Sequence, residues 1–414
     1  MSRALYSMTL YLLLPWALLH LLWRARKQPA YLDHVGERFG IFPDDTPSRV
    51  IWIHAVSVGE TRAAEPLINA LQARHPGHRI LLSHGTPTGR QTGEGLYGNR
   101  VERCYLPYDF GWASHRFLRR FRPVVGVFIE TEIWPNLIQA SVLSAVPVYL
   151  VNARMSEKSA RGYRRIGRLT RAALTTLSAI GAQTVRDAQR LVDLGAKDVN
   201  VTGNIKFDRV APAEMLALGV TLRNSFGTQR PVFLAASTRE GEEAMILDAL
   251  AGFENPTLLT VIVPRHPERF QEVAALARQR GHKVQRRSEN RPIEADTRIV
   301  IGDSMGEMFA YYAACDVAFI GGSLLPLGGQ NLLEACAVGR PVIVGPHTFN
   351  FEDATSGAIE AGAAIRVIDE RELGSAINQM VHDPDRRAAM SGAGKRFTDA
   401  HRGATEKTLK LLKW

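Results

Sequence analysis

The sequence predicts an α/β protein made of two doubly wound halves, each with a mostly parallel sheet. Short apolar runs rich in β-branched residues alternate with segments of roughly 10–15 residues whose apolar positions recur at helical spacing. The chain has 414 residues, which exceeds the usual size of one domain, roughly 100–200 residues. The alternation loosens around Asp208–Gln229, where Pro212, Gly219, Gly227 and Pro231 interrupt it. We therefore expect a domain boundary near residue 210.

The first expected element is an apolar helix over Ala4–Trp23, a stretch without Asp, Glu, Lys or Arg. Its length is close to the ~20 residues that cross a bilayer as a helix. The basic stretch Arg24–Lys27 follows it, against the single basic Arg3 before it, so the positive-inside rule places the remainder in the cytoplasm. No small-residue cleavage site follows Trp23. These features favour an uncleaved anchor over residues 1–27, spanning the membrane or lying in its interface, over a buried core helix.

The first half, residues 28–210, begins with a connector and then alternates strands with helices. The expected strands are Val50–Ile53, Arg79–Ser83, Val101–Leu106, Val124–Ile129, Val146–Val151 and Ala179–Ala182. The expected helices are Thr61–Arg74, Thr88–Tyr97, Trp112–Phe121, Pro135–Ala145 and Gly162–Leu177. Such alternation is typical of βαβ units.

The second half, residues 211–414, repeats the pattern. Its expected strands are Val232–Ala236, Leu258–Val263, His282–Gln285, Ile299–Ile301, Val317–Ile320, Pro341–Val344 and Ala363–Val367. Its expected helices are Glu242–Leu250, Pro267–Arg280, Met308–Ala314, Asn331–Ala337 and Glu352–Ala361. Two open α/β sheets of similar size follow from this arrangement.

Composition narrows the class of function. The 51 Lys and Arg residues exceed the 41 Asp and Glu residues, a net charge of +10 that suits an anionic partner such as nucleic acid, an anionic membrane or a phosphorylated substrate. The three cysteines are far apart and show no metal-ligand spacing, which favours a reducing compartment and no metal site. Neither a G-x-x-x-x-G-K-[ST] loop nor a G-x-G-x-x-G turn after the first strand of either half is present, which disfavours a nucleoside triphosphatase and a conventional dehydrogenase.

The stretch Ile51–Glu60, IWIHAVSVGE, reads as a buried strand, a turn of small residues and the start of a helix. Ligands of open α/β sheets bind at the carboxyl ends of the strands, so Glu60 stands where a catalytic carboxylate is expected. The alternative is that Glu60 only stabilises the first turn of its helix through the helix dipole.

Further candidates follow other strands. Glu130 and Glu132, two residues apart, would lie on one side of a continued strand, although one of them could cap the helix near Pro135. Lys206 lies near the domain boundary, where it could reach a cleft or pair with Asp208.

In the second half, FIGGSLLPLGGQNLLE (319–334) reads as a strand, two Gly-Gly turns and a helix start. Glycines permit close approach of backbone N–H groups to an anion, so we expect phosphate or ribose to bind here. The alternative is a capping box formed by Asn331 and Glu334. Arg265 and His266, at the end of another strand, suggest a second anion site.

Basic residues recur at helical spacing in two segments. In one, Arg161, Arg164, Arg165 and Arg168 would share one helix face; the other contains Arg116, Arg119, Arg120 and Arg122. Such faces are usually solvated, and on an anchored protein they could meet anionic headgroups.

Taken together, nine segments in order resemble the bacterial 3-deoxy-D-manno-oct-2-ulosonic acid (Kdo) transferases. They are HAVSVGE (54–60), TPTG (86–89), LPYD (106–109), ETEIWPN (130–136), NARMSEKS (152–159), GNIKFD (203–208), PRHPERF (264–270), GGQNLLEA (328–335) and VGPHTFNF (344–351). Many relatives carry His-Asn-Pro where this chain has Gln330-Asn331-Leu332, a departure that leaves Asn331 and Glu334 in place.

The resemblance implies a GT-B glycosyltransferase with two Rossmann-like domains, an acceptor-binding one over 28–210 and a CMP-Kdo-binding one over 211–414. It implies inverting, metal-independent transfer of Kdo from CMP-Kdo to lipid A precursor at the cytoplasmic side of the bacterial inner membrane, without a cofactor. By that likeness Glu60 is the general base, and Glu130 and Lys206 stabilise the transition state. The residues that it implies for CMP binding are Arg265, His266, Gly306, Glu307, Met308, Asn331, Leu332, Leu333 and Glu334.

Two other functions are compatible with parts of the sequence. A membrane-associated GT-B transferase using a UDP-sugar would share the fold and the membrane side. A non-catalytic membrane-associated protein that binds nucleotides or nucleic acid would use the net charge, but the basic segments lack the interleaved aromatic residues of a single-strand nucleic-acid platform. We therefore expect anionic lipids, CMP-Kdo and lipid A precursor as partners, and no nucleic acid.

Overall fold

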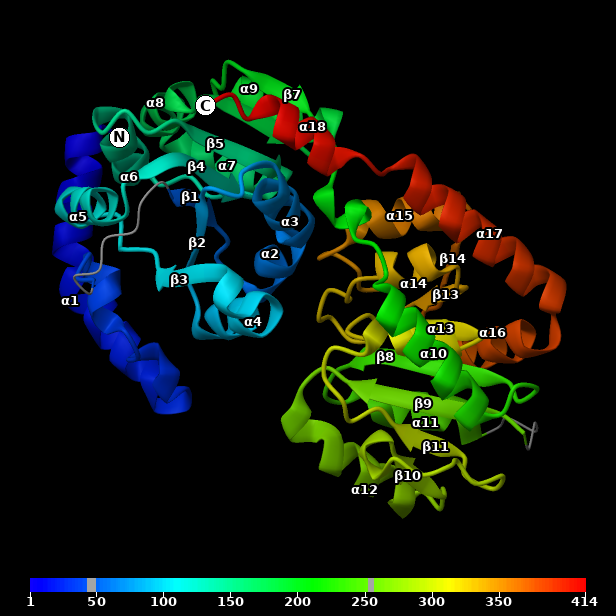
Figure 1. Cartoon of the computed structure of the whole chain (residues 1–414). Helices are drawn as coiled ribbons and strands as arrows, with labels where there is room; N and C mark the ends of the chain where they lie inside the picture. Colours follow the sequence, from blue (N-terminus) through cyan, green and yellow to red (C-terminus); the bar gives the residue numbers. More distant parts are fainter. Residues whose placement is uncertain (43–49, 252–256) are drawn as a thin grey trace. The chain divides into compact units, whose positions relative to one another are not determined.

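The computed structural model describes residues 1–42, 50–251 and 257–414, which form two compact units (Figure 1). Unit 1 comprises Met1–Arg209 and His401–Trp414, and unit 2 comprises Val210–Ala400. Each unit contains a seven-stranded sheet in which all strand pairs are parallel. The predicted class of two doubly wound α/β halves is confirmed.

The sheet of unit 1 has the strand order β3-β2-β1-β4-β5-β6-β7. Its strands are β1 (Val50–His54), β2 (Arg79–His84), β3 (Val101–Tyr105), β4 (Pro123–Ile129), β5 (Val148–Ala153), β6 (Ala179–Ala182) and β7 (Val199–Val201). From β1 the chain winds outward to β3 and then crosses back to β4, which pairs with the other side of β1. The topological switch point, where ligands of open α/β sheets bind, therefore lies between β1 and β4.

Helices cover both faces of this sheet. They are α1 (Arg3–Lys27), α2 (Val58–Ala63), α3 (Glu65–Arg74), α4 (Pro87–Tyr97), α5 (Gly111–Phe121), α6 (Pro135–Leu143), α7 (Glu157–Arg165), α8 (Gly167–Thr176), α9 (Val185–Asp193) and α18 (Ala404–Leu411), with short 3-10 turns η1 (Pro29–Tyr31), η2 (Val35–Phe39), η3 (Gly98–Arg100) and η4 (Ile205–Asp208). Alternate residues of β1 point to opposite faces. Val50 and Trp52 pack in one core with Phe117 of α5, whereas Ile51 packs in the other with Leu67 of α3.

The sheet of unit 2 has the order β10-β11-β9-β8-β12-β13-β14, so its switch point lies between β8 and β12. Its strands are β8 (Val232–Thr238), β9 (Leu259–Pro264), β10 (Val284–Arg286), β11 (Ile299–Ile301), β12 (Val317–Ile320), β13 (Val342–Val344) and β14 (Ala364–Arg366). Its helices are α10 (Ala213–Phe226), α11 (Glu242–Ala251), α12 (Phe270–Gln279), α13 (Met308–Ala314), α14 (Leu333–Val338), α15 (Glu352–Glu360), α16 (Glu370–His382) and α17 (Pro384–Ala400), with turns η5 (Pro267–Arg269) and η6 (Arg287–Glu289).

Two features of the domain ranges differ from the prediction. The final segment, expected within residues 211–414, belongs to unit 1, because Leu409 of α18 is buried in its core and Asp208 accepts hydrogen bonds from the amides of Gly403 and Thr405. The N-terminal helix, expected as a segment of its own, also groups with unit 1. Both chain ends thus belong to the first unit.

Most of the segment Asp208–Gln229, where the alternation of the sequence loosens, forms α10. Pro212 precedes the helix, where a proline is tolerated. Gly219 is buried against α13, and a Cβ at this position would lie 2.4 Å from the Cβ of Ala313. The glycine therefore permits close helix packing and does not break the helix.

Two predicted helices are divided. The segment 61–74 breaks between α2 and α3, because Pro66 in the first turn of α3 has no N–H to continue the preceding helix. The segment 162–177 begins earlier, at Glu157, and breaks at Ile166 between α7 and α8. Arg161 and Arg168 therefore lie on different helices, and the expected single basic face is wrong.

The helix α1 is the one helix of the described chain that is long and apolar enough to cross a membrane. Most of its apolar side chains are exposed, and Leu12 and Trp16 have 74% and 62% of their surface accessible. Only Leu21 and Ala25 of this helix are buried, in a small cluster with Tyr31. An exposed apolar helix of this kind is compatible with a membrane anchor.

We expect Gly219→Ala to lower the free energy of unfolding by about 1–3 kcal/mol, because the new methyl group would overpack the contact between α10 and α13. Gly95→Ala in α4 is the matched control, since a Cβ there meets no atom within 4 Å and replacing an exposed helical glycine by alanine stabilises by about 0.5–1 kcal/mol. Denaturant unfolding of both variants checks the expectation. Equal stability of the two variants would contradict the proposed packing.

Candidate active site

Glu60 lies three residues past the N-cap Ser57, where β1 leads into α2. Its Oε2 accepts a hydrogen bond of 2.9 Å from the Ser57 amide, the carboxylate half of a capping box. Burial raises the pKa of Glu60 to about 7, with further contributions from the negative charges of Glu130 and Glu132. The helix-capping role is therefore real, but it coexists with a carboxylate poised to exchange a proton near neutral pH.

Glu130 follows β4, the strand that flanks β1 at the switch point. It adopts a φ of 65°, a left-handed conformation that is strained for a residue other than glycine. Its Oε1 accepts a hydrogen bond of 2.7 Å from Nζ of Lys206. The alternative partner of the lysine, Asp208, instead accepts from backbone amides at the start of α18. The two residues that the resemblance implicated in transition-state stabilisation thus form a direct ion pair.

A buried asparagine positions Lys206. Asn152, the penultimate residue of β5, also has a positive φ of 52°, and its Oδ1 accepts a hydrogen bond of 3.0 Å from the amide of Ile205 in η4. The side chain of Asn204 also accepts from the Lys206 amide, at 3.0 Å. The backbone of the turn is therefore fixed at Ile205 and at Lys206 itself.

Glu132 contacts a different set of side chains. Its Oε2 accepts a hydrogen bond of 2.7 Å from Nε1 of Trp134 and lies 3.7 Å from Nε2 of His54. His54 is fully buried, and its Nδ1 lies 2.9 Å from Oγ of Ser83. The strand does not continue through Glu130 and Glu132, because β4 ends at Ile129, so the condition under which they would share one side is not met.

The N-terminus of α6 is capped from elsewhere. Neither Glu130 nor Glu132 caps it, since the amides of Asn136 and Leu137 donate to Asp109 at 3.0 and 2.8 Å. Sequence reasoning passed over Asp109 as a functional residue, although it closes the LPYD segment that carried the resemblance. In the sequence Asp109 is a single acidic residue shortly after a strand, a pattern too common to indicate a functional residue.

In unit 2 the carboxylate of Glu242 holds the Gly-Gly segment after β12 by accepting hydrogen bonds from its backbone amides. The fully buried carboxylate of Glu242 accepts hydrogen bonds from the amides of Gly322 (2.5 Å), Leu324 (3.0 Å) and Arg239 (3.0 Å). Burial raises the pKa of Glu242, and these three N–H donors oppose that shift. The amides of Gly322 and Leu324 are therefore not available to a ligand phosphate, contrary to the expectation that the Gly-Gly pairs expose them.

The glycines have a conformational role instead. Gly322, Gly328 and Gly329 all have positive φ values, between 73° and 91°. A Cβ at Gly321 would lie 2.5 Å from the carbonyl oxygen of Ser237. The segment thus needs glycine for its backbone path and for its close approach to β8.

The Asn331–Glu334 capping interaction is present. Oδ1 of Asn331 accepts from the amide of Leu333 at 3.1 Å, and Nδ2 donates to Oε1 of Glu334 at 3.2 Å. Leu332 and Leu333 are buried, so of these two residues only the backbone is suited to meet a ligand. Both side chains of the capping pair remain half-buried.

Arg265 and His266 follow β9, beside the switch point of unit 2. Burial lowers the pKa of His266, with further lowering from the positive charge of Arg239, so the imidazole is neutral at pH 7 and can donate or accept one hydrogen bond. Arg239 itself follows β8, and its Cγ would lie 3.6 Å from a Cβ at Gly322. Its guanidinium has no carboxylate partner among the described residues.

Sequence reasoning missed Arg239. Its position in the sequence indicated a site, because Arg239 directly follows the first strand of the second half. The Glu60 segment follows the first strand of the first half in the same way. Arg269, by contrast, is structural: its Nη1 donates to the buried carboxylate of Glu243 at 2.7 Å. A guanidinium without a carboxylate partner at a switch point is suited to hold a phosphate.

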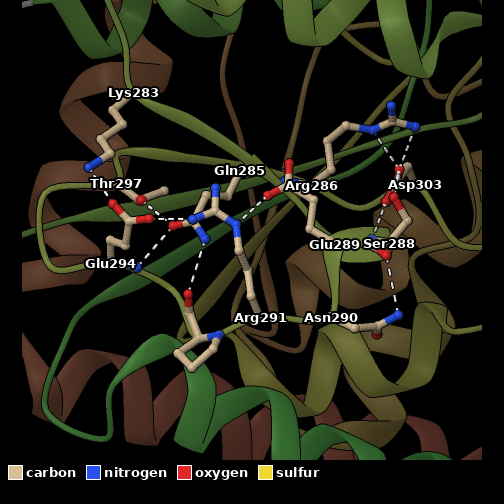
Figure 2. A network of polar contacts seen from close by, with 11 residues as sticks. Lys283, Gln285, Arg286, Ser288, Glu289, Asn290, Arg291, Glu294, Thr297 and Asp303 are labelled. Atoms are coloured by element: carbon tan, nitrogen blue, oxygen red, sulfur yellow. Dashed lines mark hydrogen bonds and ion pairs between the residues drawn. The ribbon is translucent and has the colours of Figure 1, made fainter.

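Gly306, Glu307 and Met308 lie where the loop after β11 enters α13. Glu307 accepts a hydrogen bond of 2.7 Å from Oγ of Ser304. A polar network anchors the same loop through Asp303 (Figure 2), whose carboxylate accepts from Arg286 at 2.7 Å and from the amide of Ser288 at 2.8 Å. The loop is therefore held rigidly against β10 and η6.

No group of three or more His, Cys, Asp and Glu side chains in the described ranges is arranged to hold a metal ion. Cys104, Cys315 and Cys336 are buried and free. The acidic cluster of unit 1 and the basic cluster of unit 2 are instead suited to proton transfer and to anion binding.

Comparison with protein families gives two matches. Residues 33–209 match the family described as 3-Deoxy-D-manno-octulosonic-acid transferase (kdotransferase), and residues 245–397 match the family described as Glycosyl transferases group 1. A curated 3-deoxy-D-manno-octulosonic acid transferase of Bordetella pertussis is 44% identical over 427 residues, which cover 100% of this chain and 99% of the relative. A transferase of the same name from Haemophilus influenzae is 37% identical and covers 94% of this chain and 92% of its own.

Solved structures share the architecture at low identity. A UDP-GlcNAc 2-epimerase from Neisseria meningitidis bound to UDP-GlcNAc is 14% identical with a TM-score of 0.59, covering 88% of this chain and 99% of its own. A glycosyltransferase from Rickettsia africae is 12% identical with a TM-score of 0.59, covering 88% and 98%. These likenesses, with the two parallel sheets, identify the fold as GT-B.

We expect Glu132→Gln to lower the pKa of Glu60 from about 7, because removing a nearby negative charge favours the ionised carboxylate. The carboxyl ¹³C chemical shift of Glu60, followed from pH 4 to pH 9, measures the change. Glu94→Gln, on the exposed surface of α4, should leave the titration unchanged. A pKa that does not move in Glu132→Gln would contradict the electrostatic coupling.

Proposed function

This chain belongs to the 3-deoxy-D-manno-octulosonic acid (Kdo) transferase family of glycosyltransferases, and we propose that it moves Kdo from CMP-Kdo to the lipid A precursor lipid IVA. The proposed transfer inverts the anomeric carbon and uses neither metal ion nor cofactor. Its catalytic residues are Glu60, Glu130 and Lys206. The observation that carries the proposal is the placement of Glu60 at the switch point of unit 1, with a pKa of about 7.

Glu60 is the proposed general base. The acceptor hydroxyl would lose its proton to the carboxylate as its oxygen attacks the anomeric carbon of Kdo, and CMP would leave with the bonding electron pair. A base works best when its pKa lies near the working pH, and such catalysis contributes typically about 10²–10⁴-fold. Burial and two neighbouring carboxylates supply that pKa here.

Lys206 is the proposed electrostatic stabiliser. Its ammonium would offset the negative charge of the donor carboxylate or of the departing phosphate, which lowers the barrier in a partly buried site. Glu130 holds the ammonium at 2.7 Å and limits its rotamers. The contribution of Glu130 is therefore to keep the ammonium oriented.

CMP is the proposed ligand of unit 2. Arg265 and Arg239 would hold the phosphate, and the neutral imidazole of His266 would add one hydrogen bond. Backbone and side-chain groups of Gly306–Met308 and Asn331–Glu334 would contact the nucleotide from the loops that precede α13 and α14. Because CMP is a good leaving group, these protein donors are sufficient for departure without a metal ion.

We place the protein at the cytoplasmic side of the bacterial inner membrane. The exposed apolar face of α1 would enter the bilayer, and the basic residues 24–27 would face anionic lipids. The helix contacts unit 1 near both of its ends, through Tyr6 and through Leu21. A helix held in this way favours a position along the membrane surface over a crossing.

The exposed Arg116, Arg119 and Arg122 add positive charge on α5 and just after it.

We expect Glu60→Gln to lower kcat of Kdo transfer by about 10²–10⁴-fold, with CMP binding unchanged. Glutamine retains the oxygen that accepts from the Ser57 amide, so the substitution separates the base from the helix cap. Mass spectrometry of the product from CMP-Kdo and a tetra-acylated disaccharide acceptor measures transfer and the number of Kdo residues added.

Glu94→Gln is the control for this variant and should transfer Kdo at the wild-type rate. Full activity of Glu60→Gln would exclude Glu60 as the base. Turnover of the wild type with a UDP-sugar but not with CMP-Kdo would overturn the proposed donor, and absence of any transfer would favour a binding protein.

We expect Arg239→Ala to weaken CMP binding about 10–150-fold, since a charge-assisted hydrogen bond contributes about 1.5–3 kcal/mol. Isothermal titration calorimetry with CMP checks this, and Arg278→Ala on the exposed surface of α12 is the control. Equal affinities of the two variants would remove Arg239 from the nucleotide site.

A further inference from the structure

Asp109 joins two elements that are far apart in the sequence. Its carboxylate is 4% exposed and accepts three hydrogen bonds. Two come from the amides of Asn136 and Leu137 in the first turn of α6, at 3.0 and 2.8 Å. The third comes from the hydroxyl of Tyr6 in α1, at 2.9 Å.

Asn136 makes a second connection between the same elements. Its Nδ2 donates to the backbone oxygen of Asp109 at 2.7 Å, and its Oδ1 accepts from Oγ of Ser7 in α1 at 3.1 Å. The side chain is 6% exposed. Asp109 and Asn136 thus form a buried pair that is bonded on one side to α1 and on the other to the start of α6.

The start of α6 is also the end of the catalytic loop, residues 130–134. The loop is fixed at its beginning by the amide of Glu130, which donates to the carbonyl of Val151 at 2.9 Å. At its end the loop runs into Pro135 and the Asp109–Asn136 pair. Because Glu130 has a positive φ, its conformation persists only where both flanking segments are held.

We propose that Tyr6 and Ser7 of the N-terminal helix are positioning residues, which hold the loop carrying Glu130 and Glu132 through the Asp109–Asn136 pair. This inference rests on the proposed function, in which that loop supplies the catalytic carboxylate partner of Lys206. An apolar anchor needs no hydrogen bond to the domain that it tethers, and each polar contact of α1 with Asp109 or Asn136 costs desolvation. The membrane helix is therefore part of the scaffold of the acceptor-side site.

The pKa of Asp109 depends on its hydrogen bond from Tyr6. Burial raises its pKa to about 6, and the hydrogen bonds from Asn136, Leu137 and Tyr6 oppose this shift. Loss of the Tyr6 donor would raise the pKa further, and a protonated Asp109 accepts less strongly from the α6 amides. Tyr163 of α7 is the other titratable group whose charge acts on Tyr6.

Hydrogen–deuterium exchange of full-length Tyr6→Phe tests the structural link without any assay of activity. We expect the amides of residues 136 and 137 to exchange about tenfold faster, since their acceptor is weakened. Tyr11→Phe is the matched control on the same helix, because the Tyr11 ring packs on Phe110 while its hydroxyl bonds to no described residue. Equal exchange in the two variants would overturn the link.

Kinetics of the same two proteins in detergent micelles test the positioning role. We expect kcat of Tyr6→Phe to fall about tenfold with the KM for CMP-Kdo unchanged, while Tyr11→Phe retains both constants. The deficit in kcat should widen from pH 8 to pH 6, and Ser7→Ala should show a smaller loss. Unchanged kcat in Tyr6→Phe, or a loss equalled by Tyr11→Phe, would overturn the role.

Failure of the proposed function gives a different result. If wild-type protein transferred no Kdo, the activity assignment would fall, whereas the exchange experiment would still decide whether α1 holds the loop. A loss of kcat in Tyr6→Phe that accompanied a lower membrane-bound fraction in vesicle sedimentation would assign the hydroxyl to anchoring and would also overturn the proposal.

Discussion

The acidic cluster of unit 1 depends on one electrostatic constraint, the crowding of three carboxylates where β1 and β4 end. Burial of Glu60 and the negative charges of Glu130 and Glu132 together raise the pKa of Glu60, because both effects disfavour its ionised form. Each of the three carboxylates contacts different partners. Lys206 pairs with Glu130, Trp134 and His54 contact Glu132, and the Ser57 amide donates to Glu60.

Buried carboxylates organise both units by the same chemistry. In unit 1 Asp109 gathers the first amides of α6, and in unit 2 Glu242 gathers the amides of the segment after β12. Helix starts and tight turns leave backbone N–H groups unpaired, and a buried anion satisfies several of them at once. In each unit the buried anion thus fixes a loop next to the switch point, where the functional side chains are displayed.

Several expectations from sequence were right because they depend on local or regular features. The strand that begins at Val50, its turn and Glu60 follow from apolar content and a cluster of small residues, and parallel topology then places Glu60 at the carboxyl edge. Family resemblance supplied the proposed roles of Glu130 and Lys206. The predicted strands of both halves correspond to strands of the structure, since buried parallel strands have a strong apolar signal.

The sequence by itself determined the fold class, the apolar N-terminal helix and the position of Glu60, since each depends on periodicity or on neighbours in the chain. Only the tertiary structure decided which groups meet: Glu130 with Lys206, Asp109 with Tyr6, and Glu242 with the amide of Gly322. It also showed that Gly219 belongs to a helix and that the last residues return to unit 1. These facts depend on contacts between residues far apart in the chain, and no local pattern encodes such contacts.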